Sequence, residues 1–257
     1  MERITSRKNP LLTQIRKLAA GSGRDRRAAG EYLGDGRKLL EEALKWHAHL
    51  TTVVVSEGVE LPNLPPEVRA VQVPRDVMET ISPMKTPQGA LFLARLPETE
   101  PPETLAGDRY LVLDGVQDPG NVGTIWRTAD ALGAAGVVLL EDTADLYNPK
   151  VVRSTMGSLF HLPVYTGVKA GEMEAWCRKN GYALWATALE GAEDVTKLQW
   201  PAKTALVLGS EAEGVSPEIL AAADQKVKIP MAGQAESLNV AVAGGIVMFE
   251  AARSFSS

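Results

Sequence analysis

The feature that most constrains the fold is a regular alternation of short apolar runs and helical segments from Arg109 to the C-terminus. Strands are predicted at 110–113, 136–140, 184–188, 205–208 and 226–229, and helices at 121–132, 171–180 and 240–253. These strands lack the polar alternation of a half-exposed sheet, and most are separated by helices. That pattern predicts an α/β domain with a mostly parallel sheet and helices on both faces. Ligands of such sheets bind beyond the carboxyl ends of the strands.

The N-terminal part of the chain predicts a second, smaller α/β domain. A helix is expected at 37–46 and strands at 51–55, 68–73 and 90–94. A stretch rich in proline and glutamate follows, and it has the composition of a linker. We therefore predict a first domain at residues 1–96, a linker at 97–108 and a second domain at 109–257.

Charge is distributed unevenly along the chain. The 257 residues have a formal net charge of −5, which taken alone argues against nucleic acid as a partner. Residues 1–38, however, carry a net charge of +6, so the remaining 219 residues carry −11. A basic segment of this kind is either a solvated surface or an arm that contacts RNA phosphates. No aromatic residue precedes Tyr32, so the arm is expected to grip an RNA backbone rather than stack on bases.

The counts of metal-binding residues and apolar runs limit the remaining classes. One cysteine and three histidines do not provide a disulfide or a multi-cysteine metal site. The longest apolar stretch falls short of the ~20 residues that a membrane span requires, and no signal core follows the N-terminus. We expect a cytoplasmic protein without a metal, whose reactivity comes from an organic cofactor.

Four segments rich in glycine and polar residues follow or flank the predicted strands. They lie at 114–127, 148–158, 206–216 and 229–239. None is a dinucleotide fingerprint, a P-loop or a serine hydrolase elbow. Asn121 is expected to cap a helix that carries Arg127, and a surface pair between Arg127 and Asp130 is the plain alternative to catalysis. Ser237 and Asn239 are candidate caps of the last helix.

In this order, the segments resemble the SpoU/TrmH group of SPOUT-class RNA ribose methyltransferases. The first family motif, an Asn followed six residues later by an Arg, is matched by Asn121 and Arg127. The second, G-x-E-x-x-G, is matched at 209–214, and the third, I-P-M-x-G-x-x-x-S-L-N-V, at 229–240. The N-terminal part is similar, more loosely, to the family's substrate-binding extension, which has a fold like that of a small RNA-binding ribosomal protein.

The resemblance implies a trefoil-knotted fold, a homodimer and S-adenosylmethionine as the cofactor. It places the cofactor among the loops that contain Gly209, Ile229 and Leu238. Met231, an apolar side chain suited to an adenine, and Thr187 are the further candidate cofactor contacts. The residues to which it gives catalytic roles are Arg127, Asn121, Glu211, Ser237 and Asn239. The candidate RNA ligands are cations of the N-terminal part and of the second segment: Arg7, Lys8, Arg24, Arg26, Arg27, Arg37, Lys150 and Arg153.

Arg127 has two alternative roles in this reading. It either accepts the proton of a ribose 2′-hydroxyl or, in better agreement with the high pKa of a guanidinium, orients the hydroxyl and stabilises developing negative charge. The other four catalytic candidates are expected to hold the arginine and the ribose in place. The small residues of the last helix, Ala241, Ala243, Gly244 and Gly245, are compatible with close approach of a second protomer.

The sequence therefore predicts an S-adenosylmethionine-dependent enzyme that methylates a ribose 2′-hydroxyl of structured RNA, with ribosomal RNA favoured by the domain layout. Transfer RNA is the alternative substrate. A non-catalytic RNA-binding ribosome-assembly factor is the alternative from another class, although such a scaffold has no need of the complete polar motif set. A nicotinamide-dependent oxidoreductase lacks the expected glycine fingerprint.

Overall fold

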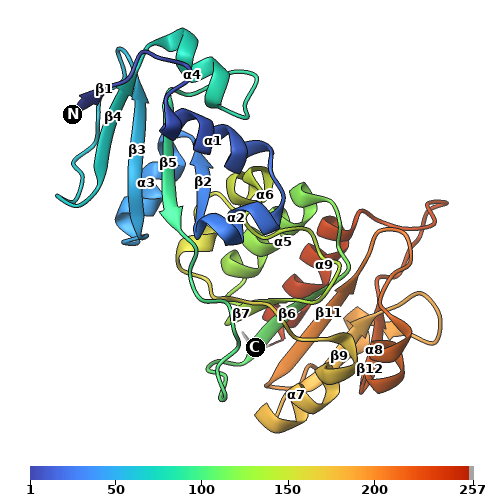
Figure 1. Cartoon of the computed structure of the whole chain (residues 1–257). Helices are drawn as coiled ribbons and strands as arrows, with labels where there is room; N and C mark the ends of the chain where they lie inside the picture. Colours follow the sequence, from blue (N-terminus) through green and yellow to red (C-terminus); the bar gives the residue numbers. More distant parts are fainter. Residues whose placement is uncertain (255–257) are drawn as a thin grey trace. The chain divides into compact units, whose positions relative to one another are not determined.

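The computed structural model describes residues 1–254 and divides into two compact units (Figure 1). Unit 1 consists of Met1–Glu98 and Asp145–His161, and unit 2 of Thr99–Ala144 and Leu162–Ser257. The segment Asp145–His161 thus leaves the C-terminal half of the chain and packs with the N-terminal unit. Within residues 1–254 no helix is both long and apolar enough to cross a membrane.

Unit 1 is built on a five-stranded sheet in the order β1-β4-β3-β5-β2. Its strands are β1 (Glu2–Arg3), β2 (Glu31–Asp35), β3 (Leu50–Ser56), β4 (Arg69–Val73) and β5 (Ala90–Arg95). Strands β1, β4 and β3 run parallel, whereas β5 pairs antiparallel with both β3 and β2. Its helices are α1 (Pro10–Ala20), α2 (Gly23–Ala29), α3 (Arg37–Lys45), α4 (Arg75–Ile81) and α6 (Pro149–Ser154).

Residues 1–38 are part of the core of unit 1 and not a separate basic arm. In α1, Leu11, Leu12, Ile15 and Leu18 lie on one helical stripe, and each is at most 6% exposed. The basic residues of α1 occupy the other side of the helix, so one segment supplies both core and charged surface. The prediction of an arm was wrong because the excess of positive charge obscured this apolar stripe.

Unit 2 contains a seven-stranded sheet in the order β10-β12-β9-β11-β6-β7-β8. Its strands are β6 (Arg109–Asp114), β7 (Gly136–Leu139), β8 (Val164–Tyr165), β9 (Ala183–Thr187), β10 (Glu193–Asp194), β11 (Thr204–Gly209) and β12 (Gln225–Lys228). Every strand pair is parallel, which confirms the predicted sheet. Helices α5 (Pro119–Ala131), α7 (Met173–Asn180), α8 (Pro217–Ala222) and α9 (Val240–Arg253) flank it.

The helices of unit 2 cover both faces of the sheet (Figure 1). Val112 and Val207 point to one face, where they join the core cluster formed with α7 and α8. Their neighbours Leu111 and Leu206 point to the other face, toward α5 and α9. Both central strands, β6 and β11, are therefore apolar on every side, and their polar neighbours are confined to the ends.

Candidate functional site

The motif loops of unit 2 meet beyond the carboxyl ends of its central strands. Strands β6 and β11 end side by side, because Asp114 and Gly209 are paired in register. The loop after β6 leads into α5, and the loop after β12 leads into α9, which packs against α5. Three of the four segments identified in the sequence are thereby brought together.

A chain of hydrogen bonds links one side chain from each of these three loops. The Asn121 Nδ2 group donates to Glu211 Oε1 at 2.8 Å, and Asn239 Nδ2 donates to Asn121 Oδ1 at 3.1 Å. Because a carboxylate only accepts, the amide of Asn121 has a defined orientation: its nitrogen faces Glu211 and its oxygen faces Asn239. We call Asn121, Glu211 and Asn239 the motif network. The sequence predicted all three residues, and the structure places them in contact.

Glu211 also accepts hydrogen bonds from the backbone before α5. The amides of Gln117 and Asp118 donate to its two carboxylate oxygens at 3.2 and 3.4 Å. Burial raises the pKa of Glu211, but the hydrogen bonds from the Asn121 side chain and from backbone amides outweigh it, so the pKa lies below its ordinary value. Glu211 is therefore an ionised anchor for the start of α5 at neutral pH.

The sequence predicted the N-cap of α9 correctly but not that of α5. Asp118, not Asn121, caps α5: its Oδ1 accepts from the backbone of Asn121 at 2.9 Å, and Pro119 occupies the first helical position. The prediction for Asn121 was wrong because proline starts this helix two residues earlier, which frees the Asn121 side chain for Glu211. Asn239 does cap α9, since its Oδ1 accepts from the amides of Ala241 at 2.9 Å and Val242 at 3.3 Å.

Gly209 is required by the chain's own turn. A Cβ atom at this position would lie 2.0 Å from the backbone of both Gly214 and Val215. Ser210 and Gly214 close the turn with two backbone hydrogen bonds of 2.9 and 3.0 Å, and Gly214 has a φ of +75°. The family resemblance places Gly209 against the cofactor, and the structure adds an internal reason for a glycine here, since the tight turn holds Glu211 against α5.

Two of the five predicted catalytic residues lie outside the motif network. Arg127 is exposed on α5, and its position is rotated about 240° from Asn121 around the helix. Among residues 1–254 the Arg127 side chain makes no hydrogen bond or ion pair, so the alternative pair with Asp130 is not formed. Ser237 is likewise exposed and without a hydrogen bond within the described chain.

The loops around the motif network fit an adenosine-containing cofactor. Ile229 and Leu238 are half-buried and Met231 is 40% exposed, so apolar surface is available for a flat base. No hydrogen bond among residues 1–254 uses the backbone of residues 230–238. Free amide and carbonyl groups next to apolar side chains are what recognition of a base edge requires. Thr187, at the end of β9, donates to the carbonyl of Val207 at 3.1 Å.

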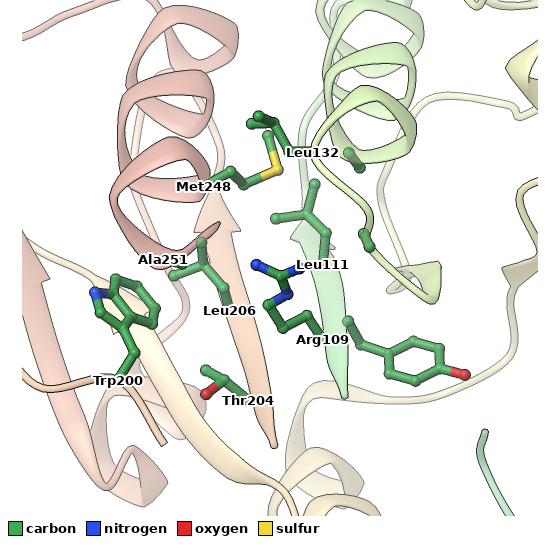
Figure 2. A pocket seen from close by; sticks show the side chains of 11 residues that line it. Arg109, Leu111, Leu132, Trp200, Thr204, Leu206, Met248 and Ala251 are labelled. Atoms are coloured by element: carbon green, nitrogen blue, oxygen red, sulfur yellow. The ribbon is translucent and has the colours of Figure 1, made fainter. Parts of the chain in front are cut away.

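A separate apolar pocket in unit 2 lies at the opposite ends of the strands, between the sheet, α5 and α9 (Figure 2). The side chains labelled there are Arg109, Leu111, Leu132, Trp200, Thr204, Leu206, Met248 and Ala251. Its lining is almost entirely apolar and contains none of the motif residues. Such a lining has no means of orienting a polar cofactor, so we do not assign the cofactor to it.

The candidate RNA ligands of unit 1 separate into buried and exposed groups. Arg26 is only 2% exposed, donates to Asp145 through Nε at 2.7 Å and through Nη2, and donates to the Leu18 carbonyl at 2.7 Å. It holds the segment Asp145–His161 and is not available to RNA, contrary to the prediction. Arg7 is exposed but paired with Asp76 at 2.6 Å. The other exposed candidates are Lys8, Arg24, Arg27, Arg37 and Lys150, and Arg153 is half-buried.

No group of three or more histidine, cysteine, aspartate or glutamate residues within the described residues has the arrangement of a metal site. Unit 2 is a parallel α/β unit with glycine-rich motif loops at its strand ends, and unit 1 is a smaller α/β unit with exposed cations. This combination is that of a cofactor-dependent enzyme that modifies nucleic acid. Residues 108–249 match the SpoU rRNA Methylase family, and residues 9–91 match the MRM3-like substrate binding domain. The chain therefore belongs to the SpoU rRNA methylase family.

Several relatives and solved structures match over nearly the whole chain. The chain is 34% identical to the 23S rRNA (guanosine(2553)-2′-O)-methyltransferase RlmP of Bacillus subtilis, over 97% of this chain and 98% of the relative. It is also 34% identical to the 23S rRNA (uridine(2479)-2′-O)-methyltransferase of Streptomyces viridochromogenes, over 98% of this chain and 92% of the relative. The AdoMet-bound rRNA methyltransferase from Sinorhizobium meliloti matches with a TM-score of 0.87 and 31% identity, covering 100% of this chain and 99% of the other.

Proposed function

We propose that this protein is an S-adenosylmethionine-dependent enzyme that methylates a ribose 2′-hydroxyl of ribosomal RNA. The observation that carries the proposal is the hydrogen-bonded motif network, because it joins residues of all three family motifs at the ligand-binding edge of a parallel sheet. The two 23S rRNA methyltransferases with equal identity are named for the ribose of different nucleosides, a guanosine and a uridine. Neither relative's name therefore identifies the nucleotide that this enzyme modifies.

S-adenosylmethionine, when bound, supplies an electrophilic methyl group. We place it against Gly209, Ile229 and Leu238, with Met231 and Thr187 at the edge of the site. The backbone of residues 230–238 recognises its polar edges, since no other partner in the described chain occupies those groups. The protein's part in the reaction is to align the 2′-hydroxyl with the methyl group and to assist loss of its proton.

Arg127 is the group that we assign to the reacting hydroxyl. Its guanidinium has five donors and no partner within residues 1–254, so it is available to an RNA phosphate and to the developing alkoxide. Orientation and charge stabilisation are favoured over proton abstraction because a guanidinium stays protonated at neutral pH. Asn121, Glu211 and Asn239 hold the loops in place, and Ser237 is assigned to the ribose.

We further propose that the enzyme is a homodimer that pairs through α9. Val242, Ile246 and Phe249 are 52%, 37% and 55% exposed and follow one another at helical spacing on one face of α9. An apolar stripe of this kind is typical of an interface between protomers. Gly245 lies in the same region of α9 and has no side chain; a Cβ atom there would lie 3.7 Å from the Thr128 side chain of α5.

The remaining assignments follow from the domain layout. Residues 1–96 are proposed as the RNA substrate-binding domain, 97–108 as the linker and 109–257 as the methyltransferase domain, with the trefoil-knotted threading that the family resemblance implies. The RNA ligands are the exposed cations Lys8, Arg24, Arg27, Arg37 and Lys150, together with Arg7 and Arg153. A ribosomal RNA substrate makes the cytoplasm the expected compartment.

The test is methyl transfer from radiolabelled S-adenosylmethionine to purified 23S, 16S and transfer RNA, followed by mapping of the 2′-O-methyl position. We expect transfer to ribosomal RNA and its loss in Arg127→Ala, with cofactor affinity within about twofold by isothermal titration. Arg127→Lys is the matched variant that keeps the charge without the planar fork. Methylation of transfer RNA alone would show that transfer RNA, and not ribosomal RNA, is the substrate. Cofactor binding without transfer to any RNA would favour the ribosome-assembly factor.

A further inference from the structure

An exposed aromatic pair lies on unit 1, away from the motif loops in sequence. Trp46, immediately after α3, is 42% exposed, and its ring is stacked on that of His161 with 4.3 Å between centroids and 29° between planes. The two rings come from the two separate stretches of chain that form unit 1. They meet only because the segment Asp145–His161 packs against the N-terminal part.

The orientation of the pair is fixed by the contacts of Glu42. The Trp46 indole N–H donates to Glu42 Oε2 at 3.2 Å. The loop before His161 approaches the same glutamate so closely that a Cβ atom on Gly157 would lie 2.9 Å from its Cβ. Gly157 also has a φ of +105°, which disfavours any side chain there. The rings are therefore held in place before any ligand arrives, which lowers the entropy cost of binding to them.

One cation lies next to the Trp46 ring, and further cations belong to the same segment of chain as His161. Lys45 Nζ lies 5.2 Å from the Trp46 ring centroid. Lys150 and Arg153 belong to the same segment as His161, and Met156, next to Gly157, is 43% exposed. Aromatic stacking surfaces combined with nearby cations are the means by which proteins bind single-stranded RNA.

We propose that Trp46 and His161 form a stacking platform for an unpaired base of the RNA substrate. This inference rests on the proposed function, because it takes RNA as the ligand of unit 1. It adds a base contact to a domain whose sequence predicted backbone contacts only. The plain alternative is that the pair fastens the segment Asp145–His161 to α3 and has no ligand.

The experiment measures binding of a fluorescein-labelled uridine hexamer by anisotropy to the full-length protein. Trp46→Ala is expected to weaken binding about 5- to 100-fold, and Trp46→Phe, which keeps a ring, to stay within about threefold of wild type. The salt dependence of binding is expected to stay the same in Trp46→Ala, since no phosphate contact is removed. His161→Ala should also weaken binding, because it removes the second ring of the pair. His49→Ala is its matched control, because His49 is an exposed histidine of unit 1 outside the ring pair.

An abasic hexamer with the same phosphates separates stacking from charge. Wild type should bind it as weakly as Trp46→Ala binds the uridine hexamer. Equal binding of both hexamers by wild type, or wild-type affinity in Trp46→Ala, would overturn the platform. If Trp46→Ala is unfolded in a thermal melt, quenching of tryptophan emission decides: the hexamer should quench a component in wild type that Trp46→Phe lacks, and equal quenching contradicts the proposal.

Methyl transfer to ribosomal RNA, measured in parallel, keeps the two proposals apart. Hexamer binding that depends on Trp46, without methyl transfer to any RNA, would uphold the platform and reject the enzymatic function. Unimpaired hexamer binding by Trp46→Ala in an enzyme that methylates ribosomal RNA would do the reverse.

Discussion

Replacing Glu211 with glutamine changes the one charged member of the motif network with little change in shape. The carboxylate accepts from Asn121 Nδ2 at 2.8 Å and from the amides of Gln117 at 3.2 Å and Asp118 at 3.4 Å. A glutamine has only one acceptor oxygen, and its NH₂ group would face another donor. Hydrogen bonds to charged groups contribute about 1.5–3 kcal/mol each. Because Glu211 is exposed and two of its bonds are long, screening reduces the expected total loss to roughly 1 kcal/mol.

Hydrogen exchange of the backbone at the start of α5 measures this loss directly. A cost of about 1 kcal/mol corresponds to about fivefold faster exchange of the Gln117 and Asp118 amides in Glu211→Gln. Glu213→Gln is the matched control, because Glu213 lies on the same turn and its carboxylate accepts no hydrogen bond within the described residues. Equal protection in wild type and Glu211→Gln at neutral pH would refute the reasoning.

The difference in amide protection between wild type and Glu211→Gln should depend on pH. The pKa of Glu211 is lower in the folded state, so its contribution is fully present above the ordinary glutamate pKa of about 4.3 and is lost as pH falls through the folded pKa. After correction for intrinsic rates, the difference in protection between wild type and Glu211→Gln should be present at about pH 7 and should decrease as the pH falls through the lowered pKa of Glu211. A difference that persists in acid would mean that charge is not its cause.

Three further perturbations test other parts of the structure. Gly209→Ala places a Cβ atom 2.0 Å from the backbone of its own turn, so it should destabilise the loop by roughly 1–3 kcal/mol and weaken S-adenosylmethionine binding, measured by calorimetric titration. Arg26→Ala leaves Asp145 without its buried partner and should lower the free energy of unfolding, measured in a thermal melt, by about 3 kcal/mol. Arg27→Ala removes the neighbouring exposed side chain and should leave the free energy of unfolding almost unchanged. Phe249→Arg puts a charge on the apolar face of α9 and should yield a monomer in sedimentation analysis; an unchanged mass would reject that face as the interface.

The sequence was most informative where strands are buried on both faces. The central strands β6 and β11 appear as uninterrupted apolar runs, and both were predicted to within one or two residues. The segment of residues 1–38 was misread because its charge was counted before its periodicity. The stripe from Leu11 to Leu18 has helical spacing, and Pro10 after Asn9 marks the start of the helix. Both signals were present in the sequence and pointed to a core helix.

The motif loops were predictable because parallel strands end at one edge, which brings their loops together whatever their separation along the chain. The partner of Arg26 was not predictable in this way. Asp145 is 119 residues away, and neither residue belongs to a repeating pattern that marks it as buried. The packing of the segment Asp145–His161 with unit 1 was not predictable for the same reason. Its contacts with α3 and β2 depend on single side chains and one glycine, which form no pattern in the sequence.

The hydrogen-bond inventory separates the five catalytic candidates into two kinds. In the motif network each polar group of Asn121 and Glu211 already has a partner inside the protein, so these residues are suited to positioning and not to chemistry. Arg127 makes no such bond within residues 1–254, so its donors remain available to the substrate. This division predicts different responses to chemical rescue. Added guanidinium should restore part of the methyl transfer lost in Arg127→Gly, because it replaces a group that acts on the substrate. It should restore none in Asn121→Gly, whose defect is the lost orientation of two loops, and equal rescue of both variants would contradict the division.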